Sequence, residues 1–202
     1  ILNYIDESMD ETDIFFDIGA NIGVFSLYAA KRHHGLKSYC FEPEFSNLHY
    51  LKNNIFENNL TEHIEVYSLA IGDHDGLSKL HIQDKTPGAA MHAENLEHIE
   101  STYEGFPVIW QDEIVSRTLD SLCLEMNVIP NVLKIDTDGN EFKILNGAPE
   151  ILTNDKLRTI IMEVPLVEEF DIKCSRLLKS SGFKIDWEEK NSSNRIWVRE
   201  GG

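Results

Sequence analysis

The stretch FFDIGANIG, residues 15–23, decides the fold of this chain. Its first residues form an apolar run typical of a buried strand, and residues 21–32 carry apolar side chains at the helical period. Between these segments, Gly19 can adopt a positive φ, and Asn21 tolerates the left-handed region better than most residues do. The stretch therefore predicts a strand, a tight turn and a helix whose free N–H groups can bind an anionic group.

Strand-like and helix-like segments alternate along the rest of the chain. This alternation predicts a single α/β domain over residues 1–202, with a mostly parallel sheet and helices on both faces. The last two strands are too close for a crossover helix, so we expect an antiparallel hairpin at one edge. The expected strands are residues 12–18, 36–42, 63–71, 77–83, 131–137, 157–164, 183–189 and 194–200, and the expected helices are 21–32, 44–59, 118–127, 140–148 and 168–182.

Composition narrows the partners of the chain. The formal net charge of −17 over 202 residues repels phosphate backbones and anionic lipid, or simply keeps the protein in solution. No apolar run approaches the ~20 residues that span a bilayer, and no secretory signal is visible. The three cysteines, Cys40, Cys123 and Cys174, form no CxxC pair. We therefore expect a cytoplasmic protein, with its cysteines reduced, that binds neither nucleic acid nor membrane.

The glycine spacing after the first strand distinguishes two kinds of cofactor site. Counted from Gly19, a dinucleotide fingerprint needs glycine at positions 21 and 24, where this chain has Asn21 and Val24. The pattern instead resembles D-x-G-x-[GN]-x-G of S-adenosylmethionine (SAM)-dependent methyltransferases, through Asp17, Gly19, Asn21 and Gly23. We expect Gly23 to let the following helix pack closely on the strand. The alternative is a glycine-bearing turn that binds no ligand.

The ends of the next two strands add candidates for an adenosine site. Glu42 lies about 20 residues beyond the turn, where an acidic side chain accepts hydrogen bonds from both ribose hydroxyls. Both NAD and SAM carry this diol, so Glu42 does not choose between them, and it is otherwise a solvated strand-end carboxylate. Ala70 and Ile71 are expected to line the adenine face. Asp73 either reaches the adenine amino group or serves only the turn GDHDG.

Five blocks in order make the chain similar to FkbM-family methyltransferases: FFDIGANIGVFSLYAA, FEPEFSNLHYLKNN, LAIGDHDG, RTLDSL and VLKIDTDGNEFKILNGA. The last block is the most specific, although Asp138 stands where the family usually has glutamate. The resemblance implies a Rossmann-like class I fold, with seven strands of which the last is antiparallel. It also implies methyl transfer from SAM to hydroxyls of sugars or polyketide-like products.

Three acidic residues are candidates for the reacting end of the site. Asp136 lies at the end of the expected strand 131–137 and faces the methyl group of the cofactor by its position in the fold. Glu141 follows at the next helix, where it is either catalytic or only favours the helix N-terminus. Glu163 lies at the end of the expected strand 157–164 and is a second acid near the same rim. A carboxylate of this group can take the proton of an alcohol, and a divalent metal is the less favoured alternative.

Residues 84–116 interrupt the alternation and form an expected insertion over the acceptor site, with a strand near 108–110. His92 is a candidate base within it, and Tyr103 and Trp110 can stack on a sugar ring or simply pack. The sequence therefore favours a SAM-dependent O-methyltransferase for a small molecule or glycan, with SAM as cofactor and no metal. The alternatives are a catalytically silent SAM-binding module and an NAD-linked oxidoreductase.

Overall fold

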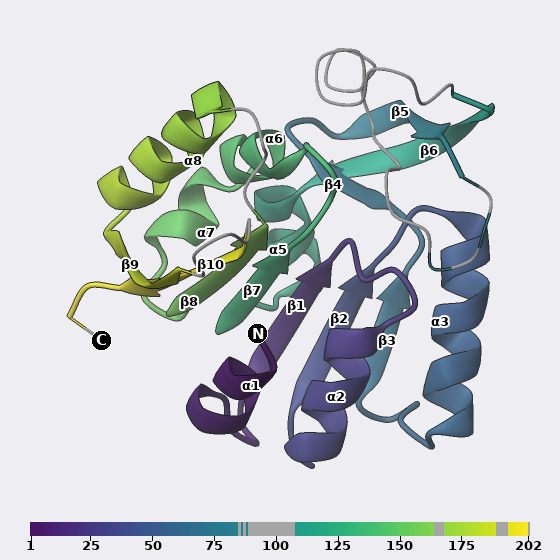
Figure 1. Ribbon diagram of the computed structural model, residues 1–202. Helices are drawn as coiled ribbons and strands as arrows, with labels where there is room; N and C mark the ends of the chain where they lie inside the picture. The colour runs from purple at the N-terminus through teal and green to yellow at the C-terminus, as the bar shows by residue number, and fades with distance from the viewer. Residues whose placement is uncertain (85, 87, 89–107, 164–167, 189–193, 202) are drawn as a thin grey trace.

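A computed structural model describes residues 1–84, 86, 88, 108–163, 168–188 and 194–201. Its main element is a seven-stranded sheet with the strand order β3-β2-β1-β7-β8-β10-β9 (Figure 1). The first five strands in this order, β3, β2, β1, β7 and β8, run parallel to one another, and β10 is antiparallel to both of its neighbours. The fold expected from the sequence is confirmed. The strands are β1 (Ile14–Ile18), β2 (Lys37–Phe41), β3 (Ile64–Tyr67), β7 (Val132–Ile135), β8 (Thr159–Glu163), β9 (Phe183–Glu188) and β10 (Asn194–Arg199).

Helices cover both faces of this sheet, because alternate residues of its central strands are apolar on both sides. Phe15 packs with residues of α1 and α2, whereas Phe16 packs with residues of α5, α6, α7 and α8. Helix α1 was not expected from the sequence; it seats Ile5 against the first of these faces. The helices are α1 (Leu2–Ser8), α2 (Val24–Arg32), α3 (Phe45–Glu57), α5 (Leu119–Met126), α6 (Glu141–Asn146), α7 (Pro149–Thr153) and α8 (Glu168–Ser180).

The C-terminal hairpin has its more apolar strand on the inside. Strand β10 is inserted between β8 and β9, and its Ile196 and Trp197 are buried. Strand β9 takes the edge, where all of its residues after Phe183 are exposed. The expected antiparallel hairpin at one edge is confirmed, and burial of the Trp197 side chain explains which of the two strands takes the inner place.

A second, three-stranded sheet lies over the carboxyl ends of the main strands (Figure 1). Its order is β4-β6-β5, and its strands are β4 (Ala70–Gly72), β5 (Gly76–Ile82) and β6 (Trp110–Thr118). The expectation of one continuous strand over residues 63–71 is therefore wrong: the segment breaks after Tyr67, and Ala70 pairs with Ser116 of β6 in the second sheet. Sequence periodicity could not show this change of partner, because both halves of the segment are strands.

Helical spacing predicts that one buried face of α3 carries Leu48, Leu51, Ile55 and Phe56, and the structure corrects one of these four positions. Leu48, Leu51 and Ile55 are buried as expected, but the Phe56 residue is 71% exposed. Phe56 follows Ile55 by one position and is therefore rotated by about 100° around the helix axis. This rotation carries its ring out of the apolar stripe that contacts the sheet.

The three cysteines are buried and unpaired. Cys40 packs with residues of α2 and α3, and Cys123 and Cys174 belong to the large cluster on the opposite face. Burial raises the pKa of the Cys123 and Cys174 thiols to about 12. All three thus behave as small apolar residues, as the sequence indicated.

Candidate active site

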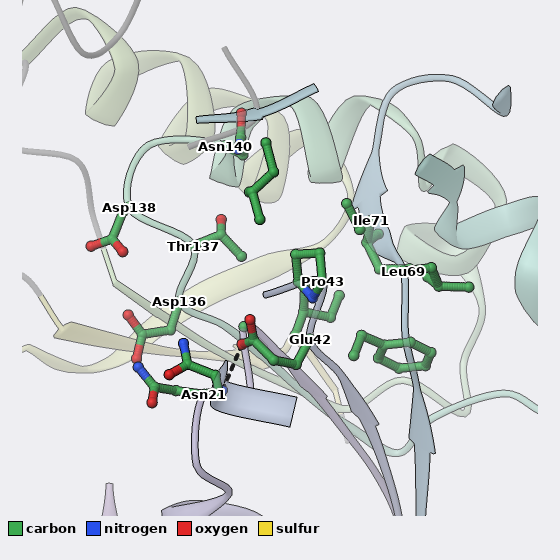
Figure 2. Close-up of a pocket in the computed structure, with 15 residues that line it drawn as sticks. Asn21, Glu42, Pro43, Leu69, Ile71, Asp136, Thr137, Asp138 and Asn140 are labelled. Atoms are coloured by element: carbon green, nitrogen blue, oxygen red, sulfur yellow. Dashed lines mark hydrogen bonds between the residues drawn. The ribbon is translucent and has the colours of Figure 1, made fainter. Parts of the chain in front are cut away.

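A pocket opens where the carboxyl ends of β1 and β2 meet the loop between β7 and α6. It contains about 570 Å³ of empty space, counted out to its open mouth. Figure 2 shows Leu69 and Ile71 on one side of this pocket and Asp136 and Asp138 on the other. The lining residues are Ile18, Gly19, Asn21, Phe41, Glu42, Pro43, Asn47, Leu69, Ala70, Ile71, Leu80, Asp136, Thr137, Asp138 and Asn140.

Two glycines shape the turn after β1. Gly19 has φ of +70°, and a Cβ atom there would lie 1.9 Å from the backbone oxygen of Asp136, so no larger residue fits without moving the loop after β7. Gly23 has φ of +88°, and its Cβ would lie 2.3 Å from Cδ1 of Leu51. Gly23 therefore makes room for Leu51 of helix α3, and its expected role in packing α2 on the strand stays a prediction.

Glu42 is held by the turn that the sequence singled out. Asn21 has φ of +50°, and its backbone N–H donates to Oε2 of Glu42 at 2.8 Å, while the N–H of Glu44 donates to Oε1 at 2.9 Å (Figure 2). Glu42 is only 5% exposed, and this burial raises its pKa to about 7, although both N–H bonds act in the opposite direction. Each carboxylate oxygen keeps a further lone pair. Glu42 can therefore accept two hydrogen bonds from a ligand in the pocket.

The other side of the pocket is apolar. Leu69, Ala70 and Ile71 come from the segment that enters the second sheet, and Leu80 reaches the pocket from β5. The placement of Ala70 and Ile71 is as expected, whereas sequence reasoning missed Leu80 because it belongs to another sheet. Asp73 is absent from the lining; its carboxylate lies on the turn after β4, with Oδ1 3.1 Å from Nδ1 of His74. Its contact with adenine stays a prediction.

Asp17 lies beneath the pocket rather than on its wall. Its side chain is fully buried, and it accepts hydrogen bonds from Oγ of Ser26 at 2.8 Å and from Nζ of Lys134 at 3.0 Å. Lys134 was not singled out from the sequence, although a lysine in the otherwise apolar strand VLKI was an available signal. This placement makes Asp17 a support of the turn, and its direct contact with a cofactor stays a prediction.

Asp136 and Glu163 come together at the reacting end. Asp136 lines the pocket, its side chain is 34% exposed, and its Oδ2 lies 3.3 Å from Nζ of Lys134. Burial favours the neutral acid, but the charge of Lys134 and hydrogen bonds with Glu163 and Lys134 lower the pKa of Asp136 below its ordinary value. Asp136 and Glu163 are therefore neighbours at the reacting end, where their strand-end positions predict them.

Glu141 holds the loop that carries Asp136. Its Oε1 accepts hydrogen bonds from the Thr137 N–H and hydroxyl, both at 3.1 Å, and from the Gly139 N–H at 3.2 Å. The residue is 1% exposed and does not line the pocket, and burial raises the pKa of its carboxyl. Its contacts are those of a loop support, and a catalytic role for it stays a prediction.

The start of the expected insertion contacts the mouth of the pocket. The N–H of Gly88 donates to Oδ1 of Asn47 at 2.8 Å, and Nδ2 of Asn21 donates to the Gly88 carbonyl at 3.4 Å. Asn47, which was not expected from the sequence, thus links α3 to residue 88. His92 and Tyr103 lie outside the described residues. Trp110 is exposed at the start of β6, and its Nε1 donates to Asp112.

Among the described residues, no group of three or more His, Cys, Asp or Glu side chains is placed to hold a metal ion. No helix in the described part of the chain is long and apolar enough to cross a membrane.

Comparison with known proteins shows the class of this fold and then its family. The chain resembles the solved FkbM methyltransferase of Methylobacillus flagellatus KT, with a TM-score of 0.67 and 16% identity, covering 94% of this chain and 44% of that one. It also resembles an RNA methyltransferase of Salinibacter ruber solved with S-adenosyl-L-homocysteine, with a TM-score of 0.51 and 11% identity, covering 100% and 92%. The chain thus has a Rossmann-like methyltransferase fold and spans less than half the length of the first of these structures.

Sequence comparison gives the family. The 31-O-demethyl-FK506 methyltransferase FkbM of Streptomyces tacrolimicus is 25% identical over 193 residues, covering 86% of this chain and 73% of that protein. Methyltransferase 1 of Beauveria bassiana is 22% identical over 204 residues, covering 91% and 81%. Residues 17–185 match the model of the methyltransferase FkbM domain. The chain therefore belongs to the FkbM methyltransferase family, and it is an enzyme of the methyltransferase class.

Proposed function

We propose that this chain transfers a methyl group from SAM to a hydroxyl group of a small molecule or glycan. The observation that carries the proposal is the buried Glu42 carboxylate, which shares one pocket with an apolar wall and with Asp136. A nucleoside fits this combination, because its ribose diol can donate to Glu42 while its base lies against Leu69, Ala70 and Ile71. Gly19 has no side chain and therefore leaves its side of the pocket open. A Cβ atom at this position would collide with the backbone of the loop after β7.

The reacting end supports an oxygen acceptor. SAM, when bound, supplies an electrophilic methyl group on a positively charged sulfur. Asp136, ionised beside Lys134 and hydrogen-bonded to Glu163, can accept a hydrogen bond from an acceptor hydroxyl and orient its oxygen. The methylated oxygen is a strong acid until it loses its proton, so even a carboxylate of lowered pKa is a sufficient base. The Streptomyces relative is itself named for a 31-O-demethyl compound, which agrees with this choice.

The charge of the chain supports a small-molecule or glycan acceptor rather than a nucleic acid. A formal net charge of −17 disfavours the approach of a phosphate backbone. A neutral polyhydroxyl compound meets no such repulsion, and its hydroxyl groups can donate hydrogen bonds to the carboxylates of the loop after β7.

Two further acidic residues support the reacting end indirectly. Glu141 holds the loop after β7 in place, and Asp17 forms an ion pair with Lys134, which in turn contacts Asp136.

Two experiments test the proposal in order. Isothermal titration calorimetry with SAM, S-adenosylhomocysteine (SAH) and NAD establishes the cofactor: we expect the first two to bind, and binding of NAD alone would refute the assignment. A screen of glycans, natural-product alcohols, amines and short RNAs with a radiolabelled methyl donor then identifies the acceptor. We expect incorporation into a hydroxyl compound that is lost in D136N, whereas incorporation only into RNA or amines would contradict the proposed acceptor class. SAM binding with no transfer to any acceptor would favour a silent module.

A further inference from the structure

Lys134 is a buried cation that the proposed reaction does not use directly. Its side chain is 3% exposed, and it stands in β7, where all four residues are buried. In the parallel register of β1 and β7, Asp17 and Lys134 are direct neighbours. An ammonium group so deeply buried requires oppositely charged or polar partners. The positions of these partners indicate which part of the site the charge of Lys134 affects.

The partners of Lys134 converge on the wall of the pocket. Its Nζ lies 3.0 Å from Oδ1 of Asp17, 3.3 Å from Oδ2 of Asp136 and 3.4 Å from the Gly19 carbonyl oxygen, and it lies 5.1 Å from the centre of the Phe25 ring. Asp136 and Gly19 line the pocket, whereas Lys134 does not, so the ammonium stands directly behind two wall residues. Burial lowers the pKa of Lys134, but the two carboxylates outweigh it and raise the pKa overall. Lys134 is therefore charged at neutral pH.

We propose that Lys134 balances the charge behind the reacting end and so limits how strongly the pocket prefers a sulfonium cofactor over its neutral thioether product. This inference rests on the proposed SAM-dependent function. Asp17, Lys134 and Asp136 together carry one net negative charge, and without the ammonium they would carry two. Because Lys134 acts through Asp136 and the Gly19 carbonyl rather than by touching the reacting atoms, it is a positioning residue.

The balance matters because the charge of the sulfonium disperses as the methyl group leaves. A wall with two uncompensated carboxylates would hold the charged cofactor more tightly in the ground state than in the transition state, which slows the reaction. A wall with no net negative charge would lose selectivity for SAM and would retain the product. The single net negative charge of Asp17, Lys134 and Asp136 lies between these two cases.

The test compares the dissociation constants of SAM and SAH, measured by calorimetry at one pH and one ionic strength. Replacing Lys134 by methionine keeps the length of the side chain and removes its charge. We expect the ratio Kd(SAH)/Kd(SAM) to rise roughly tenfold in K134M and to fall roughly tenfold in D136N, since each variant changes the local charge by one unit in opposite directions. A purely structural role would change both constants by the same factor and leave the ratio unchanged.

Two further variants separate folding from charge. K134M leaves Asp17 buried without its cation, so the double variant D17N/K134M removes equal and opposite charges and should return the ratio to the wild-type value. If K134M does not fold, D136N decides, because it leaves the Asp17–Lys134 pair intact. An unchanged ratio in D136N, or in a folded K134M, overturns the inference while leaving SAM binding established. Failure of the wild type to bind either compound overturns the proposed function instead.

Discussion

Ionisation of Glu42 should be linked to cofactor binding. The pKa of this carboxyl is about 7 in the protein alone, raised from an ordinary 4.5 by burial, so below neutral pH the group carries a proton. A ribose diol that donates to both oxygens favours the ionised form and lowers the pKa again. Binding therefore releases a proton. Affinity should be constant above about pH 7 and should weaken as the pH falls below it.

The size of this effect follows from the two pKa values. A return of the pKa from about 7 to the ordinary 4.5 on binding corresponds to about 3 kcal/mol. Over a practical range, the dissociation constant of SAH should be about tenfold higher at pH 6 than at pH 8. The sign for folding is opposite: the contribution of Glu42 to the stability of the free protein is full below pH 4.5 and is lost as the pH rises through about 7.

Calorimetry in buffers of different ionisation enthalpy measures both the affinity and the number of protons released. E42Q removes the ionisation and should weaken binding at pH 8 by about 1.5–3 kcal/mol, the range for a lost charged hydrogen bond. In E42Q, the affinity should also lose the part of its pH dependence that comes from ionisation of Glu42. E57Q is the matched control: Glu57 is exposed at the end of α3 and lies outside the lining, so this variant should behave as the wild type. Equal pH dependence in E42Q and wild type would refute the ribose assignment.

Three further predictions follow from the geometry. G19A should abolish measurable SAH binding and lower the melting temperature, because its Cβ would lie 1.9 Å from a backbone oxygen at φ of +70°; retained affinity would contradict the close approach. E141A should lower the free energy of unfolding in urea by about 1–3 kcal/mol, since it leaves the Thr137 and Gly139 donors without their acceptor, and an unchanged midpoint would remove the loop-support role. L51A should lower the free energy of unfolding by about 2–5 kcal/mol in the same assay, because Leu51 is fully buried. F56A should stay within about 0.5 kcal/mol of the wild type, because the Phe56 ring is rotated by about 100° away from the buried stripe and is exposed. A large loss in F56A would place that ring back in the core.

Much of the site could be predicted because its signals are local. A strand that ends in aspartate and is followed by Gly19 and Asn21 fixes the turn within a few residues, and the strand–helix rhythm places Glu42 and Asp136 at the same edge of the sheet. Both side chains line the pocket in the structure. The assignment of Phe56 to the buried face of α3 was wrong. Helical periodicity identifies which face of a helix is apolar, but it does not give the width of the face that the sheet can cover.

The sequence by itself determined the doubly wound sheet, the turn after β1 and the position of Glu42, because each depends on residues close together in the chain and on a repeating pattern of burial. Tertiary structure alone decided the second sheet, the apolar contribution of Leu80 and the ion pair between Asp17 and Lys134. The partners in that pair are 117 residues apart, and they meet only because β1 and β7 lie side by side in one register. No local pattern encodes such a contact, since its energy arises from burying two opposite charges together once the fold has formed.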